Sequence, residues 1–402
     1  MKPVFREELE FLTIPSEYEG KLWVHLRAFR YFDQEFKEVK LGRNIKNITF
    51  EPNLAKSHNE VAKFKYPHAK IADSISQINS VKDNYDRLIV FISGGKDSTV
   101  LEDIINKHTD INYELMFNNT SNETHFTYQY IKNNYASCIF INPSIGFFSW
   151  VEKNKYIPTR FNRACCDIFK EKQIGVYLND EDNIGHLCGI RKDESSKRSN
   201  YEFIKKGKWN SRQIENWDLV LPILDFTDMD IWSYILNEKI NFNKLYEFGY
   251  NRVGCTHCPY RQDFELKLNE IFLPKYSKRW EGILANIFIE SNLWSIKNCT
   301  IKEFTGGAWR GGRVRDNPSQ DVIDEFKEHN PDKDIDKYFG NKCMCGKIIK
   351  SDLVGLNQKY YGRNIDPSKY KCLKCMAREL EVTQKSLKLK IKDFKDQGCT
   401  LF

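Results

Sequence analysis

The sequence lacks the features of a membrane or secreted protein. No apolar run reaches the roughly 20 residues that a membrane-spanning helix needs. Residues 1–8, Met-Lys-Pro-Val-Phe-Arg-Glu-Glu, are too polar for a secretory signal peptide. Charge of one sign is also weak, because the net charge of +7 over 402 residues is smaller than in a dedicated nucleic-acid-binding protein. We therefore expect a cytoplasmic protein without a membrane partner.

Disulfide bonds are not expected either. Twelve cysteines in a cytosolic chain indicate metal or thiol chemistry. Eight of them form four close pairs, whereas Cys138, Cys188 and Cys299 are most simply core residues. The length, with 41% hydrophobic and 29% charged residues, suits one large globular domain and one or two small ones.

The ordinary nucleoside-triphosphate P-loop is absent too. If Gly95 and Lys96 ended that motif, Val90 would stand where its first glycine belongs and Asp97 where its hydroxyl residue belongs. An apolar strand over 88–92 nevertheless runs through paired glycines into a segment with helical periodicity. Such a turn leaves backbone N–H groups unpaired at the positive end of a helix dipole. It is an anion site, and phosphate is its natural occupant.

The turn reads Ser-Gly-Gly-Lys-Asp-Ser at 93–98, which closely resembles the pyrophosphate loop of the ATP pyrophosphatase superfamily. The resemblance implies ATP with Mg²⁺, the β and γ phosphates held by the loop, and attack on the α phosphate with release of pyrophosphate. The implied nucleotide-binding residues are Ser93, Gly94, Gly95, Lys96, Asp97, Ser98 and Thr99, with Lys96 and Asp97 also catalytic.

Strands and helices alternate after this loop. We expect strands at 113–117 and 137–141 around a helix that contains residues 126–131, which predicts βαβ units and a parallel sheet. Ligands of such sheets lie at the carboxyl ends of the strands, where the polar segment 118–124 also emerges. In the resembled family this segment borders the nucleotide, which implies roles for Thr120 and Glu123.

Further motifs follow in order: Arg163-x-Cys-Cys, Gly189-x-Arg-x-x-Glu-Ser-x-x-Arg, Pro222-Ile-x-Asp-x-Thr and Arg252-x-Gly-Cys-x-x-Cys. Over about residues 85–260 this order is similar to the phosphoadenosine phosphosulfate reductase branch of the superfamily. The matching charged turn borders the nucleotide and its substrate, and it contains Arg191, Glu194, Ser195 and Arg198. The guanidinium groups of Arg191 and Arg198 are expected to fork onto phosphate or sulfate oxygens.

Two pairs, Cys165-Cys166 and Cys255-x-x-Cys258, lie inside this region. Neighbouring side chains on a helix diverge by about 100°, so adjacent thiolates suit one tetrahedral zinc poorly and an iron–sulfur cube better. Two other interpretations of these four cysteines stay open: they bind a zinc ion, or they are two pairs that bind no metal. The resemblance to adenylylsulfate reductases, and to the sulfur-inserting enzyme of DNA phosphorothioation, implies a [4Fe-4S] cluster. Arg163, Lys170 and Lys172 would offset the charge of thiolates and a bound anion.

The C-terminal part carries a second group, Cys343-x-Cys345 and Cys372-x-x-Cys375, which resembles a zinc ribbon. Before it, residues 305–315 are expected to form a flexible basic linker, with phosphate contact as the second interpretation. Aromatic and basic residues interleave at 27–46, as in a small sheet or a single-strand-binding platform. Cys399 stands near the end of the chain, but the Glu-Cys-Gly-Leu/Ile-His tail motif of sulfonucleotide reductases is absent.

We predict an α/β protein with a parallel-sheet, Rossmann-like domain of the adenine-nucleotide alpha-hydrolase type. The expected segments are a small N-terminal region (1–80), a catalytic domain (81–262), a helical segment with linker (263–335) and a zinc-ribbon-like domain (336–402). The expected function is ATP-dependent sulfur transfer, with nucleic acid open as acceptor and a cysteine desulfurase or thiol reductant as partner. The alternatives are a sulfonucleotide reductase and a non-catalytic nucleotide-binding accessory protein.

Overall fold

The computed structural model divides the chain into two compact units, residues 1–147 with 164–274, and residues 148–163 with 275–402. The described residues are 2–11, 14, 16–25, 30–32, 38–39, 57–178, 182–196, 198–206, 216–315, 318–333, 338–339, 343, 345, 347, 349, 351–363, 365–366, 369–399 and 401. No helix in this described part is long and apolar enough to cross a membrane.

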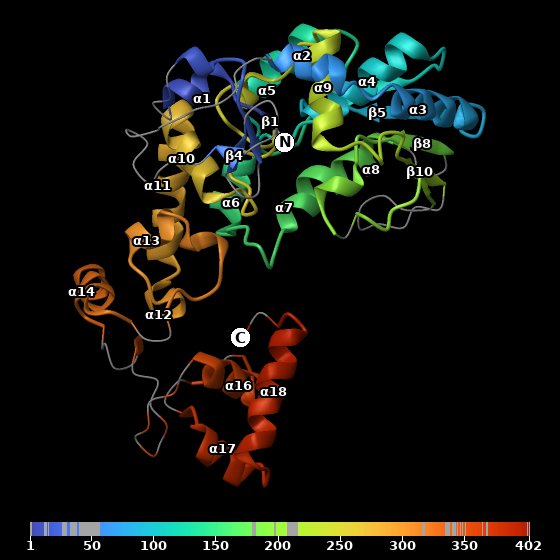
Figure 1. Ribbon diagram of the computed structural model, residues 1–402. Coiled ribbons are helices and arrows are strands. Elements are labelled where there is room, and N and C mark those ends of the chain that lie inside the picture. Colours follow the sequence, from blue (N-terminus) through green and yellow to red (C-terminus); the bar gives the residue numbers. More distant parts are fainter. Residues whose placement is uncertain are drawn as a thin grey trace. The chain divides into compact units, whose positions relative to one another are not determined.

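A six-stranded sheet forms the centre of the first unit (Figure 1). Its order is β7-β6-β5-β8-β10-β9, and only the pairing of β9 with β10 is antiparallel. The strands are β5 (Arg87–Phe91), β6 (Glu114–Asn118), β7 (Ile139–Ile141), β8 (Ile184–Leu187), β9 (Ile204–Lys205) and β10 (Trp217–Val220). From β5 the chain continues to β6 and β7 on one side of β5, and it then returns to form β8 on the other side. The strand order therefore reverses between β5 and β8, and ligands of such sheets bind at this topological switch point.

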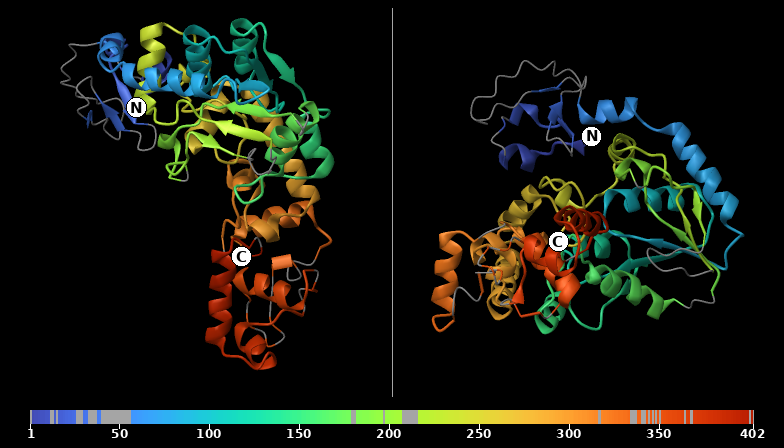
Figure 2. Two further views of the ribbon diagram at one scale, coloured as in Figure 1. Left: turned by 90° about the vertical axis from the view of Figure 1, so that its right-hand side faces the viewer. Right: turned by 90° about the horizontal axis from the view of Figure 1, so that it is seen from below.

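Alternate residues of the strands enter two cores, as the pleat requires. Leu88 and Val90 pack with one cluster, which includes the apolar faces of α3, α4 and α9, whereas Ile89 packs with a second cluster that includes Ile174 of α8. Helix α3 is the blue helix beside the yellow-green strands in Figure 2 (left). The helices are α2 (His58–Phe64), α3 (His68–Val81), α4 (Lys96–His108), α5 (His125–Asn134), α7 (Ala164–Cys166), α8 (Gln173–Tyr177), α9 (Asp228–Glu238) and α10 (Asp263–Phe272).

The N-terminal residues add a small antiparallel sheet with order β1-β2-β3-β4. Helix α1 (Arg6–Phe11) lies between β1 and β2 in the sequence. Its strands are β1 (Lys2–Pro3), β2 (Trp23–His25), β3 (Arg30–Phe32) and β4 (Glu38–Val39). The side chains of Trp23 and Val24 are buried. Most of the segment 27–46, for which we expected either a sheet or a nucleic-acid platform, lies outside the described residues.

The second unit is helical in its described part. Its helices are α6 (Phe147–Asn154), α11 (Pro274–Glu290), α12 (Trp294–Lys297), α13 (Ile301–Thr305), α14 (Gln320–His329), α16 (Ser351–Tyr361), α17 (Leu373–Glu379) and α18 (Gln384–Asp396). The predicted flexible linker at 305–315 is wrong, because Trp309 and Arg310 are buried. Arg313 also donates to the backbone carbonyl of Ser295 at 3.0 Å, so these basic residues hold the fold together.

Candidate functional site

The glycine loop follows β5 directly and opens α4. Gly95 caps the helix without a side-chain hydrogen bond, so the first helical turn keeps N–H groups free of a side-chain cap. The Ser98 hydroxyl closes the loop on itself, because it accepts from the Ser93 amide at 3.1 Å and donates to the Gly95 carbonyl at 3.0 Å. The Lys96 amide donates to the Tyr246 hydroxyl at 2.9 Å. The Gly95 amide also donates to the Ser93 hydroxyl at 3.3 Å, so the turn lies at a helix N-terminus, where anions bind, with two of its amides, those of Gly95 and Lys96, already bonded to side chains.

Two glycines are needed by this packing. Gly94 has φ +71°, and a Cβ there would lie 2.9 Å from the Thr127 methyl group. Gly189, at the start of the loop after β8, lies against the glycine loop, since a Cβ on it would lie 2.8 Å from the backbone carbon of Asp97. The loops after β5 and β8 therefore meet at the switch point of the sheet.

Four charged side chains meet beside the loop. The Lys96 ammonium lies 2.9 Å from an Asp97 oxygen and 3.1 Å from Asp228 Oδ1. The Arg191 guanidinium reaches the same two carboxylates at 2.6 Å each. Burial alone would lower the pKa of Lys96, but the two carboxylates raise it above its ordinary value. Burial would likewise raise the pKa of Asp228, but Lys96 and Arg191 hold it well below its usual range. Lys96 and Asp228 are therefore charged at neutral pH.

Arg191 differs from the prediction. Its side chain is only 2% exposed, and its fork is directed at Asp97, at Asp228 and at the backbone carbonyl of Phe226. It therefore holds the loop after β8 against the glycine loop instead of presenting two free donors to a ligand. Arg198 pairs with Glu194, whose carboxylate also accepts from the Arg191 amide at 3.0 Å. Ser195 follows this turn, and its carbonyl accepts from the Arg198 amide at 2.9 Å.

The predicted loop after β6 is buried and well ordered by hydrogen bonds. The Glu123 carboxylate accepts from the Thr120 amide at 3.0 Å and from its hydroxyl at 2.6 Å. Burial raises the pKa of Glu123. The same Thr120 hydroxyl lies 3.5 Å from the Cys255 sulfur, so this loop connects the nucleotide side of the sheet with a cysteine pair.

Cys165, Cys166, Cys255 and Cys258 lie near enough to influence one another, although among the described residues only the C-terminal cysteines form a group whose ligand atoms are close enough to hold a metal ion. The hydrogen bond to Cys166 is the largest of the effects that raise the pKa of the Cys165 thiol, and burial and the charges of Cys255 and Cys258 add to it. The pair at 165–166 opens a continuous helical stretch that contains a π-helical turn over Asp167–Lys172, a feature common at functional sites. The charge of Cys255 raises the pKa of Lys170 from that turn. Four sulfur donors beside a cation fit a thiolate-ligated metal centre, which would deprotonate them.

Buried polar side chains fix the loop that carries Cys255 and Cys258. Asn122 accepts from the Thr256 amide with its carbonyl at 2.5 Å, and its side-chain oxygen accepts from the His257 amide at 3.3 Å. Arg261 donates to the Cys255 carbonyl at 2.9 Å, and Asn269 donates to the Thr256 carbonyl at 3.0 Å. The sulfur positions are therefore set by the protein.

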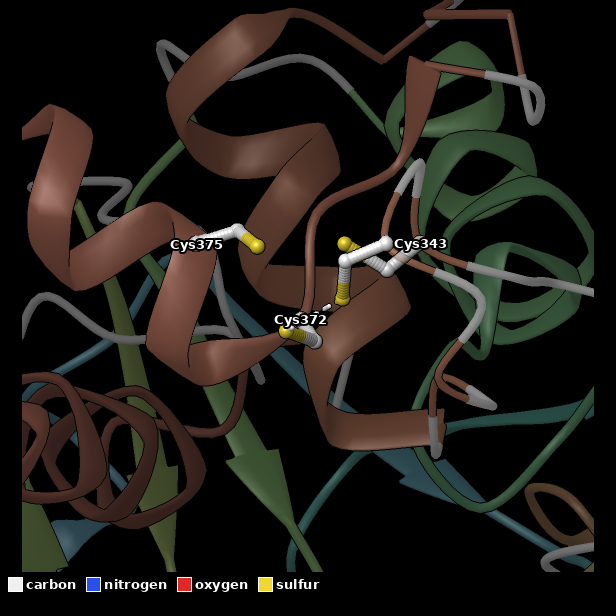
Figure 3. Close-up of side chains that lie close together, drawn as sticks. Cys343, Cys372 and Cys375 are labelled. Carbon is white, nitrogen blue, oxygen red and sulfur yellow. Dashed lines mark hydrogen bonds between the residues drawn. The ribbon is translucent and has the colours of Figure 1, made fainter.

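The second group lies in the other unit. The sulfurs of Cys343, Cys345, Cys372 and Cys375 all lie within 4.8 Å of one another. Figure 3 shows the side chains of Cys343, Cys372 and Cys375 turned toward a common centre. A tetrahedron with Zn–S bonds of about 2.3 Å has edges of about 3.8 Å. The group is therefore a metal-binding module, with a spacing that suits one ion.

The family model of the phosphoadenosine phosphosulfate reductase domain matches residues 87–261. Residues 87–261 form a phosphoadenosine phosphosulfate reductase domain. This reductase domain contains the glycine loop, the charged turn and the first cysteine group. The predicted recognition and the Rossmann-like fold class are thus confirmed.

Proteins related to this reductase domain come from archaea and bacteria. An uncharacterized protein of Methanocaldococcus jannaschii is 28% identical over 274 residues, which are 66% of this chain and 54% of that protein. Adenosine 5'-phosphosulfate reductase 1 of Bacillus subtilis is 28% identical over 43% of this chain and 73% of its own length. This chain spans between half and two thirds of the length of the two archaeal relatives with which it aligns over the most residues.

Solved structures align more weakly with the chain. The phosphoadenylyl-sulfate reductase of Candida auris has a TM-score of 0.39 and 16% identity, covering 46% of this chain and 89% of that one. The U34-tRNA thiolase NcsA of Methanococcus maripaludis, solved with its [4Fe-4S] cluster, has a TM-score of 0.30 and 10% identity, covering 76% and 91%.

Sequence reasoning missed two side chains of the reductase domain, Asp228 and Tyr246. Asp228 stands next to Thr227, the cap of α9, and it belongs to no motif, yet it bridges Lys96 and Arg191. Tyr246 also carried no sequence signal beyond its closeness to a motif, whereas Lys170 lies near the cysteines, as predicted. Arg163, predicted beside the first cysteine pair, is exposed and belongs to the second unit by its contacts.

Proposed function

We propose that this protein is an ATP-dependent sulfur-transfer enzyme. An oxygen of the acceptor attacks the α phosphorus of ATP, the bond to the β-phosphate oxygen breaks, and pyrophosphate leaves. A sulfur nucleophile then displaces the adenylylated oxygen, which departs as AMP. The acceptor therefore exchanges one oxygen for one sulfur, and one ATP is cleaved to AMP and pyrophosphate for each exchange.

The observation that carries this proposal is the intact glycine loop at the switch point, with Lys96 and Asp97 in its first helical turn. Pyrophosphate is a leaving group with high negative charge, and preorganised N–H groups with a buried ammonium stabilise it as it departs. A sulfonucleotide reductase releases no pyrophosphate and has no need for this lysine. Arg191 and Asp228 hold the lysine in place, as positioning residues.

The cofactors belong to the proposal. Cys165, Cys166, Cys255 and Cys258 are the proposed ligands of a [4Fe-4S] cluster, which would supply a soft, sulfur-binding metal site beside Thr120 and Lys170. The close spacing of the second group favours zinc. Mg²⁺ would neutralise the phosphates of ATP. The sulfur comes from a partner of the desulfurase or thiol-reductant class, and nucleic acid is the proposed acceptor.

One experiment separates this function from the alternatives. Anaerobically purified protein is incubated with [α-³²P]ATP, sulfide as the sulfur nucleophile and an RNA or DNA acceptor, and in parallel with adenylylsulfate and a thiol. Labelled AMP together with pyrophosphate supports sulfur transfer. Release of sulfite with no cleavage of ATP supports a sulfonucleotide reductase, which the resemblance to adenosine 5'-phosphosulfate reductases favours as second candidate. ATP binding without either product indicates an accessory protein and contradicts our proposal.

A further inference from the structure

The net positive charge of the chain comes from one segment. Residues 343–402 hold thirteen lysines and arginines against six aspartates and glutamates, a net charge of +7, which is the net charge of the whole chain. Residues 1–342 hold 49 residues of each sign. Four thiolates with one divalent ion would carry a charge of −2, so the segment would stay positive with its metal bound. The weak overall bias thus conceals a basic module.

Helix α18 concentrates this charge on one face. Lys385, Lys388, Lys392 and Lys395 follow one another at intervals of three, four and three residues, and all four are exposed. At 3.6 residues per turn they fall within about 80° of arc along about 15 Å of helix. We define these four lysines as the α18 lysine stripe.

The apolar face of α18 packs against other residues of the same module. Leu387 is buried, and Ile391 and Phe394 pack against the same cluster, which includes Met376 of α17. Figure 1 shows α18 in red beside α16 and α17. The apolar face of α18 is therefore used by the module itself, whereas the stripe points to solvent.

Most of the stripe is not neutralised from inside the protein. Within the described part of the chain, Lys385, Lys388 and Lys392 make no ion pair and no side-chain hydrogen bond. Lys395 pairs with Asp352 at 2.9 Å, and both side chains are largely exposed. A row of exposed, unpaired ammonium groups on a rigid helix costs repulsion unless a polyanion lies against it.

We propose that the α18 lysine stripe binds the sugar–phosphate backbone of a nucleic acid. A membrane surface is less suitable, because an interfacial helix must insert the apolar face that α18 buries in its own module. A protein partner is also less suitable, because lysine is depleted in the centres of protein interfaces. Lysine side chains contact phosphates without reading bases, which suits a module that holds a polynucleotide while another part of the chain acts on it.

This inference rests on the proposed function and deepens it by assigning the surface that holds the nucleic-acid acceptor. Its test needs neither ATP nor turnover, so the failure of one proposal is distinguishable from the failure of the other. The full-length protein is titrated into a fluorescein-labelled RNA stem-loop, the DNA duplex of the same sequence, and phosphatidylserine vesicles, at several salt concentrations. The variant is K385E/K388E/K392E, and K63E/K65E/K82E is the control with the same charge change at exposed lysines elsewhere.

The wild-type protein should bind at least one polynucleotide, with an affinity that falls linearly with salt on logarithmic axes. The stripe variant should bind at least about tenfold more weakly, and its salt slope should be shallower by about 2 to 3, the value for three lost phosphate contacts. The control should lose less than about twofold. Preference for RNA or for DNA would name the acceptor, and either supports the proposal.

Three results would overturn it: equal binding by the stripe variant and the wild type, an equal loss in the control, or binding to vesicles alone. Zinc content and thermal unfolding of each variant are measured in parallel. Because the three lysines are exposed, both should match the wild type, which separates a lost contact from a lost fold.

Discussion

The two cysteine groups differ in how the chain presents their sulfurs. In the first unit, one pair consists of adjacent cysteines at the start of a helix. The other pair lies on a loop that is fixed by hydrogen bonds from the buried side chains of Asn122, Arg261 and Asn269. In the second unit, two short knuckles place four sulfurs within 4.8 Å of one another. The first group lies within the reductase domain, whose core is formed by other residues, whereas the second lies in a small core that contains Ile349 and Tyr370. The difference indicates chemistry for the first group and structural support for the second.

The largest expected effect comes from Cys255→Ser. Loss of one ligand should bleach the iron colour and abolish formation of AMP and pyrophosphate, while zinc stays near one ion per chain. Iron and zinc are measured on anaerobically purified protein, with Cys138→Ala as the control. Loss of zinc together with iron would mean that the two groups are not independent.

Cys372→Ser should have the converse effect. The apparent free energy of binding of structural zinc is about 10–16 kcal/mol in small peptides, so the core around Tyr370 should unfold without it. Limited proteolysis should then cleave after residue 340, whereas the iron content of the reductase domain is retained. An intact, protease-resistant C-terminal segment in this variant would show that the metal is dispensable.

The substitution Lys96→Ala tests the glycine loop and leaves both cysteine groups unchanged. Removal of one preorganised positive charge from the pyrophosphate should lower turnover by about 10²–10³-fold, with iron and zinc unchanged. The control is Lys82→Ala, at an exposed lysine after α3. Turnover within a few-fold of the wild type would place the phosphates elsewhere.

Asp228→Asn should have the smallest effect. It removes one of two carboxylates that hold Lys96 and Arg191, so we expect kcat to fall by about tenfold with a smaller change in KM for ATP. Asp225→Asn, at an exposed neighbour that pairs with Lys192, should change neither constant. An equal loss in both variants would mean that Asp228 only supports the start of α9.

Much of the architecture was predictable because local patterns agreed with the tertiary structure. The strand 88–92, the glycine turn and the helix after it stand where periodicity and turn chemistry place them. The prediction of a flexible linker at 305–315 was wrong, because the glycine and arginine content of this segment is typical of mobile segments. Only packing around Trp309 and hydrogen bonds to distant carbonyls show that it is ordered.

The sequence by itself predicted the glycine loop and the four cysteine pairs, because short spacings fix which backbone amides and sulfurs are neighbours. Which pairs approach one another was decided by the tertiary structure. Only the tertiary structure decided what Arg191 does, since its partners lie 94 and 37 residues away along the chain. The same holds for Asp228, which looked like part of a helix start. Charge in a folded protein is neutralised by whatever the fold brings near, and no local pattern records that.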